Sequence, residues 1–246
     1  MSVSETVVIA ILFFAAAMLY ASVGHAGASA YLAVMGLFSF APSVMKPTAL
    51  ALNILVAAVA TARFSGAGLF SWSLFWPFAV ASIPAAFLGG AMTLPTRWYH
   101  VVVGVVLLYA AAWMFRSALK PVGIASHRPP LGIALIAGLA LGFLSGVTGV
   151  GGGIFLSPLL LYMGWAETRA TSGVAAPFIF VNSVAGLLGH FSSVAQLPSN
   201  IPVWGAAVVI GGWIGATYGS KRGPPPVLRR LLSLVLVVAG VKLAFA

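Results

Sequence analysis

Residues 22–35 read SVGHAGASAYLAVM, and residues 146–159 read GVTGVGGGIFLSPL. Each stretch is a break of small residues between two apolar runs, and each stands near the start of its half of the chain. Interrupted apolar segments at matching places in two halves are the sequence feature that best marks the substrate site of a membrane transporter. The two stretches therefore predict both a fold and the position of a site.

The composition indicates a helical membrane protein. Of 246 residues, 61% are hydrophobic and 6% are charged, whereas a soluble domain carries about 25% charged residues. Apolar runs of roughly 18 residues or more recur along the chain, which is long enough to cross a hydrocarbon core about 30 Å thick. Alternating strands of ~10 residues are not evident, which disfavours an outer-membrane barrel. Cysteine is absent, which excludes disulfides, thiolate chemistry and iron–sulfur clusters.

The net charge of +10 indicates orientation in a membrane and no nucleic-acid partner. The twelve basic residues stand singly or in pairs, mostly at segment ends, as the positive-inside bias requires. They form no basic stripe with interleaved aromatic residues. The first apolar stretch, residues 7–18, follows Glu5 and no Lys or Arg, so we interpret it as an uncleaved helix and not as a secretory signal.

The chain divides into two halves of five apolar segments each. A polar, proline-containing stretch at 118–130 is a predicted loop between a first membrane repeat (1–117) and a second (131–246). Segments 27–40 and 151–164 would each be ~21 Å long as helices, too short to span the bilayer. We predict an all-α fold with about eight full spanning helices and two short broken or re-entrant segments. The longer segments are expected at 5–23, 47–64, 72–93, 98–117, 131–148, 171–190, 202–219 and 227–245.

The distribution of basic residues favours an odd number of crossings in each half. If each half crosses five times, nine basic residues share one face and three share the other, whereas the division is far more even if the short segments do not change sides. Odd halves joined in series have opposite orientations, which predicts an inverted repeat with the basic face cytoplasmic and both termini outside. The nine are Arg63, Arg116, Lys120, Arg128, Arg169, Lys221, Arg222, Arg229 and Arg230, and the three are Lys46, Arg97 and Lys242.

The glycine breaks offer backbone N–H groups with little side-chain cover. The second break lacks the Gly-Lys-Ser/Thr ending of a P-loop and follows no strand, so neither a P-loop nor a dinucleotide fingerprint is supported. A helix that starts at such a break has about half a positive charge and unpaired donors, which attract anions. The alternative is that the glycines only let helices pack closely. The predicted substrate-binding residues at the breaks are Gly24, His25, Gly27, Ser29, Thr148, Gly149, Gly151, Gly152 and Gly153.

Polar side chains inside the spanning segments extend this candidate site. Ionisable residues in a membrane helix are costly and are functional candidates by default, so Arg63 and His190, at matching segment ends, are candidate charge partners of the substrate. Both could instead snorkel to the interface, and His25 could carry a proton, contact an anion or bond a freed carbonyl. Hydroxyls and amides contact a substrate or bond across helices. Those added to the predicted site are Thr171, Ser172 and Asn182.

The scarcity of acids favours an anion as the cargo. The chain has two carboxylates, Glu5 and Glu167, which gives little support to a cation pathway. The four histidines stand far apart and predict no metal site, and no catalytic residue or cofactor is predicted. Two alternatives remain: a membrane-embedded enzyme that pairs His25 or His190 with a serine, and a scaffold without cargo.

Further motifs lie in the second half of the chain, and the twofold repeat to which they belong covers nearly the whole chain. They are residues 149–159 (GVGGGIFLSPL), 169–172 (RATS), 189–190 (GH) and 210–216 (IGGWIGA). In order and spacing they resemble the sulfite exporter (TauE/SafE-like) family of bacterial membrane permeases. The resemblance implies two homologous halves that move small anions, such as sulfite, sulfoacetate or related sulfonates, across the bacterial inner membrane.

The resemblance also implies a secondary transporter, driven by a proton or sodium gradient and not by ATP, whose partners are a small anion and the lipid bilayer. The first half departs from the pattern of the family. Residues 24–28 read GHAGA in place of a fuller glycine run, and residues 46–49 read KPTA where a Thr-Ser pair is common. His25 thus adds a titratable group at the predicted site, which bears on the identity of the substrate. The sequence leaves the oligomeric state open.

Overall fold

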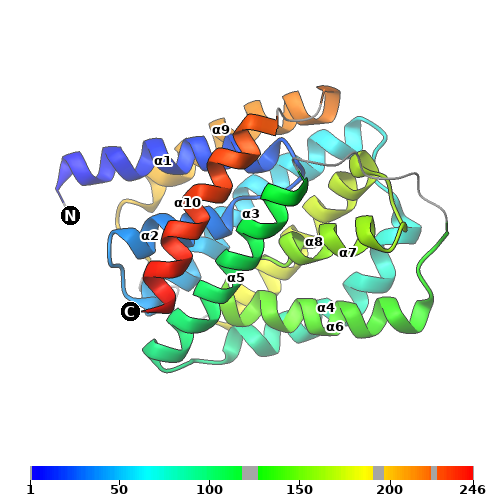
Figure 1. Cartoon of the computed structure of the whole chain (residues 1–246), viewed down its shortest axis with the longest axis horizontal. Coiled ribbons are helices and arrows are strands. Elements are labelled where there is room, and N and C mark those ends of the chain that lie inside the picture. Colours follow the sequence, from blue (N-terminus) through cyan, green and yellow to red (C-terminus); the bar gives the residue numbers. More distant parts are fainter. Residues whose placement is uncertain (1, 118–126, 191–196, 223–225, 246) are drawn as a thin grey trace.

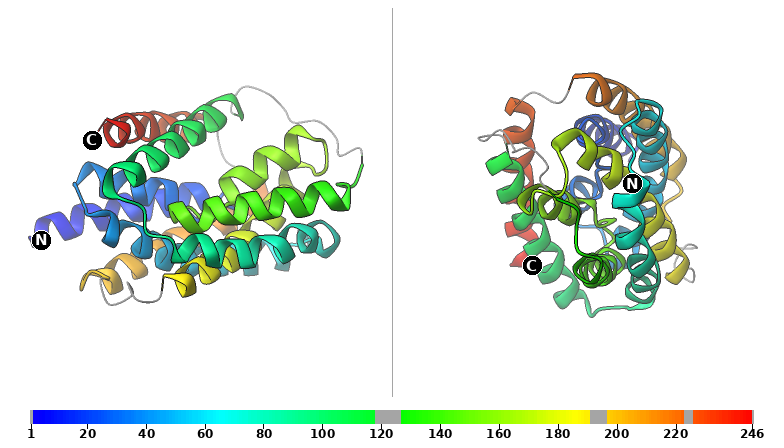
Figure 2. Two further views of the ribbon diagram at one scale, coloured as in Figure 1. Left: turned by 90° about the horizontal axis from the view of Figure 1, so that it is seen from below. Right: turned by 90° about the vertical axis from the view of Figure 1, so that its right-hand side faces the viewer.

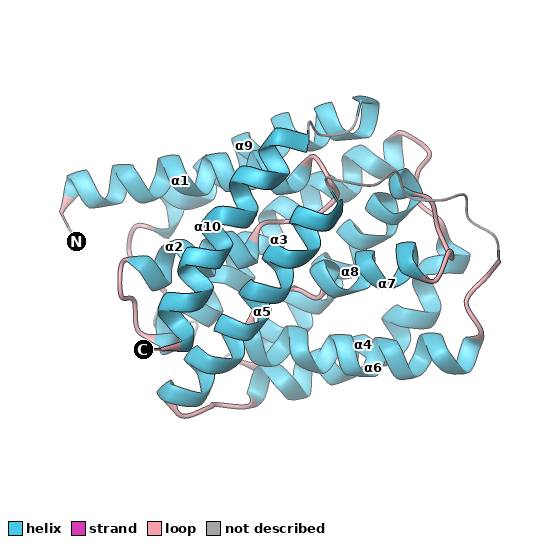
Figure 3. Cartoon of the chain, viewed as in Figure 1, coloured by secondary structure: helices cyan, strands magenta, loops and turns pink. Residues whose placement is uncertain are grey.

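The computed structural model describes residues 2–117, 127–190, 197–222 and 226–245. All regular structure within these ranges is helical (Figures 1 and 3), as predicted. Most of the predicted loop between the halves, at 118–126, lies outside the described residues. The helices are α1 (Val3–Ala21), α2 (Ala28–Leu37), α3 (Pro42–Gly66), α4 (Trp72–Ala91), α5 (Thr96–Ser117), α6 (Leu131–Thr148), α7 (Gly153–Tyr162), α8 (Thr168–Gly189), α9 (Ile201–Arg222) and α10 (Pro226–Ala244).

The two short segments are helices of ten residues each, α2 and α7. Ten residues extend about 15 Å, half the thickness of a hydrocarbon core. Six of the long helices are apolar and long enough to cross a membrane, namely α1, α3, α4, α6, α8 and α9. Helices α5 and α10 have 22 and 19 residues but are not among these six, so the total of eight spanning helices stays a prediction.

The long helices pack in pairs that join the two halves of the chain. Helix α1 lies along α9, α4 lies along α6, and α5 lies along α10 (Figures 1 and 2). Helices α3 and α8 contact each other, and each also packs on one of the outer pairs, α3 on α9 and α8 on α4. Each outer pair therefore takes one helix from either half, so the halves are interleaved.

Two of these pairs are held close by glycines spaced four residues apart. A Cβ at any of these glycines would meet a backbone carbonyl of the partner helix, so no larger residue fits at this separation. Successive glycines meet successive turns of the partner in the same order, so both pairs are parallel. Such small residues let membrane helices approach and associate. The glycines are Gly138, Gly142 and Gly146 of α6, which face α4, and Gly211, Gly215 and Gly219 of α9, which face α1.

The short helices lie inside the bundle. In α2 the nine residues from Ala28 to Gly36 are all buried, and α7 buries its first two residues together with Leu156, Ser157 and Pro158. Interrupted backbone is tolerated at membrane depth only where protein or a wet cavity surrounds it. The bundle provides that surrounding for both breaks, because α3 and α8 pass beside them.

Candidate substrate site at the two helix breaks

Both breaks end in a buried, uncapped helix start. Helix α2 begins after Gly27 and α7 begins after Gly152, whose φ angles are 105° and 79°, in the left-handed region that strains any residue with a Cβ. Neither helix receives a side-chain cap, although the first N–H groups of a helix have no partner within it. The residues on either side of each helix start, 27–28 and 152–153, are all buried. Two positive helix ends therefore lie inside the protein.

The two breaks meet through His25. Its Nε2 lies 3.2 Å from the carbonyl oxygen of Gly153 and 2.8 Å from the hydroxyl oxygen of Ser157, both on α7 of the other half. Its ring also packs against Tyr20, with the ring centroids 6.3 Å apart. The start of α7 and the first break are therefore in direct contact, with no aliphatic layer between them at this point.

The first break is also fixed by α8 and by its own tyrosines. Ser172 on α8 donates from its hydroxyl to the Val23 carbonyl at 2.9 Å, and a Cβ at Gly24 would lie 2.5 Å from the Ser172 carbonyl oxygen. Tyr31 donates to the Ala26 carbonyl at 2.7 Å. These contacts hold the unwound backbone in place from both sides.

A second tyrosine contact anchors a predicted site residue to the end of α1. Ser29 donates from its hydroxyl to the Tyr20 hydroxyl at 2.8 Å. Ser29 lies in the first turn of α2 and is buried, and so is Tyr20. The hydroxyl of Ser29 is thus held at the start of α2, one residue beyond Ala28.

The second break is held by side chains of other helices. Asn53 on α3 donates to the Val150 carbonyl at 3.2 Å and to the Ser183 hydroxyl at 3.4 Å. Tyr99 on α5 donates to the Thr148 carbonyl at 3.2 Å. Asn53 also closes in on the glycines, since a Cβ at Gly151 would lie 2.6 Å from its Nδ2. The backbone of this break is therefore shaped mainly by groups from the first half.

Several polar side chains around the breaks are buried without a hydrogen-bond partner. Buried polar groups are normally paired, and each one left unpaired costs about 1–3 kcal/mol, so these atoms are available to a polar guest. Two of the residues, Thr48 and Thr171, occupy matching places, each two positions after a basic residue. Among the described residues, the unpaired oxygens near the breaks are Thr48 Oγ1, Asn53 Oδ1, Ser145 Oγ, Thr171 Oγ1 and Asn182 Oδ1.

The structure brings most of the predicted residues together but moves the two candidate charge partners away. Arg63 is half-buried in the last turn of α3, where its guanidinium lies 4.9 Å from the ring centre of Trp213. It is ten residues, or about 15 Å, beyond Asn53. His190 follows α8 and lines a separate cavity with Lys46. Because α3 and α8 are antiparallel, matching helix ends fall at opposite ends of the bundle.

Sequence reasoning missed several residues that form the site. Ser157 is a partner of His25, and its signal was its place one turn after Gly153 on the same helix. Asn53 has no comparable local signal, because its partner is 97 residues away. Tyr99 likewise donates to a carbonyl 49 residues away along the chain. These contacts depend on packing between halves.

The geometry does not favour catalysis at His25. A histidine and a serine within hydrogen-bond reach resemble a base and a nucleophile, and His25 and Ser157 have this geometry. However, both carboxylates of the chain are exposed, Glu5 in the first turn of α1 and Glu167 before α8, so no buried acid orients the imidazole. Within the described ranges, no three His, Asp or Glu side chains gather as metal ligands.

Six apolar spanning helices and two short helices that start at buried glycine breaks define a multi-pass membrane protein with the architecture of a transporter. More specifically, the chain belongs to the sulfite exporter TauE/SafE family, whose model matches residues 8–243. It is 45% identical over 243 residues to the "Probable membrane transporter protein y4hK" of Sinorhizobium fredii (strain NBRC 101917 / NGR234), with 98% of each chain covered. No solved structure matches the chain. The predicted family is thereby confirmed.

Proposed function

We propose that this protein is a secondary transporter of small oxyanions, such as sulfite or an organic sulfonate, and that the anion binds between the two helix breaks. One observation carries the proposal: the uncapped starts of α2 and α7 are both buried and are joined through the contact of His25 with Gly153 and Ser157. Two positive helix ends directed at one place favour a negative charge there. The hydroxyls of Thr48 and Thr171, which have no partner in the described protein, would donate to its oxygens.

The packing of the helices supports alternating access between two inverted repeats. If α1–α5 are exchanged with α6–α10, the contact of α1 with α9 becomes that of α6 with α4, and the contact of α3 with α9 becomes that of α8 with α4. Helices α1 and α6 run in opposite directions along the long axis of the molecule (Figure 1). In such proteins one repeat rocks against the other around a fixed site.

The orientation follows from the basic residues. With the long axis along the membrane normal, most of the described Lys and Arg residues lie at the end of the bundle that holds the connections after α3, α5, α7 and α9. This end is then cytoplasmic by the positive-inside bias, and the membrane is the bacterial inner membrane. The N-terminus and the connection between α2 and α3 lie on the opposite, external side.

Transport in proteoliposomes tests the proposal. The purified protein is reconstituted and the uptake and efflux of radiolabelled sulfite, methanesulfonate and sulfoacetate are followed against protein-free liposomes. At least one of these oxyanions is expected to cross faster, under an imposed proton or sodium gradient. Failure with every small anion tried, under both gradients, would overturn the proposal and leave a scaffold or an enzyme.

A pair of threonine variants tests the site itself. Thr171→Val keeps the side-chain volume and removes a buried hydroxyl that has no protein partner, so folding should survive while the transport rate falls by about tenfold or more, the value of a hydrogen bond to a charged group. The matched control is Thr217→Val on α9, whose hydroxyl donates to its own helix at Trp213. An equal effect of both substitutions would remove Thr171 from the site.

A further inference from the structure

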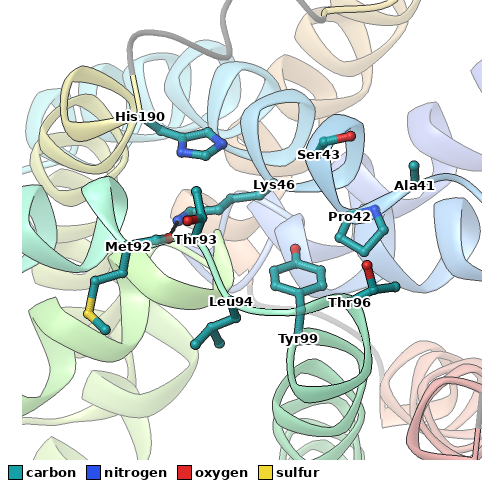
Figure 4. Close-up of a pocket in the computed structure, with 10 residues that line it drawn as sticks. All are labelled: Ala41, Pro42, Ser43, Lys46, Met92, Thr93, Leu94, Thr96, Tyr99 and His190. Atoms are coloured by element: carbon teal, nitrogen blue, oxygen red, sulfur yellow. Dashed lines mark hydrogen bonds between the residues drawn. The ribbon is translucent and has the colours of Figure 1, made fainter.

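A cavity of about 300 Å³ lies at the external end of the bundle. It is enclosed by the first turn of α3, the connection from α4 to α5, the start of α5 and the residue after α8 (Figure 4). Many of its lining side chains carry a hydroxyl, an imidazole or an ammonium group, and none carries a carboxylate. They are Ala41, Pro42, Ser43, Lys46, Met92, Thr93, Leu94, Thr96, Tyr99 and His190.

Lys46 brings a buried positive charge to this cavity. Its side chain is 4% exposed, and its Nζ donates to the carbonyls of Gly90 at 2.8 Å, Met92 at 2.9 Å and Gly89 at 3.3 Å. These carbonyls belong to the end of α4 and stabilise an ammonium only partly, through their dipoles. Both carboxylate side chains of the chain are exposed at the starts of other helices, so neither supplies a counter-charge to this ammonium.

Two further groups in the cavity are suited to an anion. His190 is 5% exposed, its Nε2 has no hydrogen-bond partner in the described protein, and its ring stands beside the Lys46 side chain (Figure 4). Helix α3 starts at the cavity after Ala41, without a side-chain cap, which adds the positive end of a helix dipole. A buried ammonium, an unpaired imidazole nitrogen and a helix start thus share one small space.

The cavity adjoins the second break. A Cβ at Gly149 would lie 3.2 Å from the Lys46 carbonyl oxygen and 3.4 Å from its Cγ, so this residue separates the ammonium from the glycine backbone. Tyr99 lines the cavity and donates to Thr148 at the same break. An anion in the cavity is therefore one residue layer away from the proposed transport site.

We propose that this cavity is a second anion-binding site, an external entrance site in which Lys46, His190 and the start of α3 hold a small oxyanion before it reaches the breaks. The inference rests on the proposed function for the nature of the anion. In this site Lys46 exchanges its longest hydrogen bond, to Gly89, for the anion and keeps the other two. The site is selective for negative charge because it contains a cation and no acid.

The absence of cysteine from the chain makes single-cysteine labelling a direct test. Thr93→Cys places a thiol on an exposed lining residue, and its rates of reaction with the anionic reagent MTSES and the cationic reagent MTSET are compared in the full-length protein in nanodiscs. The matched control is Ser73→Cys, in a cavity of about 330 Å³ that is lined by the opposite charges of Arg128 and Glu167. The ratio of MTSES to MTSET rates should be about tenfold higher at Thr93→Cys.

Three outcomes support the inference. First, methanesulfonate slows the labelling of Thr93→Cys but not of Ser73→Cys. Second, Lys46→Gln abolishes the preference of Thr93→Cys for MTSES, and third, Lys46→Arg retains that preference. At about pH 5, where His190 is charged, His190→Gln lowers the preference in a protein whose Lys46 is intact, which tests the site even if Lys46→Gln does not fold. Equal ratios in the two cavities, without protection by methanesulfonate, would overturn it. The two proposals can fail separately. If methanesulfonate protects an anion-selective cavity but the protein transports no anion, the entrance site stands and the transport function is rejected. If the protein transports an anion but the cavity is not selective for anions, the transport function stands and the entrance site is rejected.

Discussion

The two helix breaks share a backbone design but differ in what fixes them. Each has a left-handed glycine before a short uncapped helix. In the first break, Tyr31 and Tyr20 come from the flanking helices α2 and α1 and fix its carbonyl and its serine, and α8 of the other half adds one serine hydroxyl. In the second, the backbone is held by Asn53 and Tyr99, which come from α3 and α5 of the other half.

The two breaks also differ in the chemical groups that they offer to a substrate. The first break holds a titratable group, His25, which contacts the second half. The second break has no ionisable side chain of its own and offers mainly glycine backbone. A proton that accompanies the anion would therefore be carried by the first break, whereas the second would contribute backbone donors.

The largest effect is expected from the glycines. Gly24→Ala and Gly152→Ala both place a Cβ at a left-handed residue, which costs about 1–2 kcal/mol. At Gly24 the Cβ lies 2.5 Å from a backbone oxygen of Ser172, whereas at Gly152 it lies 2.9 Å from the ring edge of Phe178, which moves more easily. The free energy of unfolding, measured by denaturant titration in mixed micelles, should fall by about 3–5 kcal/mol and about 2–3 kcal/mol, respectively.

Gly132→Ala is the control for both glycine substitutions. A Cβ there has nothing within 4 Å, so its effect should stay within about 0.5 kcal/mol. If Gly24→Ala were as mild as this control, the first break would not pack against α8, and the asymmetry between the breaks would lose its structural basis.

The tyrosines give a smaller contrast. Tyr31→Phe and Tyr99→Phe each remove a hydroxyl that donates to a break carbonyl, at 2.7 Å on Ala26 and 3.2 Å on Thr148. A buried carbonyl that loses its partner costs about 1–3 kcal/mol. Tyr31 is fully buried, but Tyr99 lines a cavity where water can replace the hydroxyl, so Tyr31→Phe should destabilise more in the same titration. The reverse order would mean that the second break is the more enclosed.

The helices could be predicted from the sequence because their signals are local. Apolar runs set the helix limits to within a few residues, and glycine clusters placed both breaks, since glycine is needed where the backbone turns left-handed. The sequence also indicated that two helices were too short to span, and α2 and α7 are. Their role in binding stays a prediction.

The pairing of helices could not be predicted, because it depends on contacts between distant segments. Arg63 and His190 end matching helices in the two halves, and sequence reasoning placed both at the site. The antiparallel packing of α3 against α8 instead carries Arg63 to Trp213 and His190 to the cavity with Lys46. The sequence around Lys46 did not indicate a cavity, since it showed only a charge near a helix start.

A proton-linked role for His25 predicts a change in pH dependence. Imidazole titrates near neutrality, so protonation of His25 beside Gly153 and Ser157 would add a positive charge to the anion site. The transport rate in proteoliposomes should change by about tenfold between pH 8 and pH 5.5, and His25→Gln should flatten this profile. Ser157→Ala removes a hydrogen bond but no charge, and should retain the profile at a lower rate. If the pH profile of transport were unchanged in His25→Gln, a residue other than His25 would carry the coupled proton.

The smallest predicted effect concerns the entrance cavity. Burial lowers the pKa of His190, and the charge of Lys46 lowers it further, against an opposing backbone hydrogen bond to Gly90. A histidine with a lowered pKa is neutral at pH 7 and gains its charge only below its ordinary range, near 6.5. The other ionisable groups that line the cavity are Lys46 of α3 and Tyr99 of α5. The ratio of MTSES to MTSET labelling at Thr93→Cys should therefore rise a few-fold between about pH 7 and pH 5.

The ratio of the two reagents cancels the ionisation of the thiol itself, so a change in it reports the charge of the cavity. His190→Gln should remove the rise at low pH and leave the contribution of Lys46 intact. His100→Gln, one residue beyond Tyr99 on α5, is the matched control and should retain the rise. A rise that survives in His190→Gln but not in His100→Gln would transfer the titration to α5. In that case the positive charges of the cavity would come from Lys46 and His100, which both belong to the first half. The titratable group of the breaks, His25, belongs to the same half.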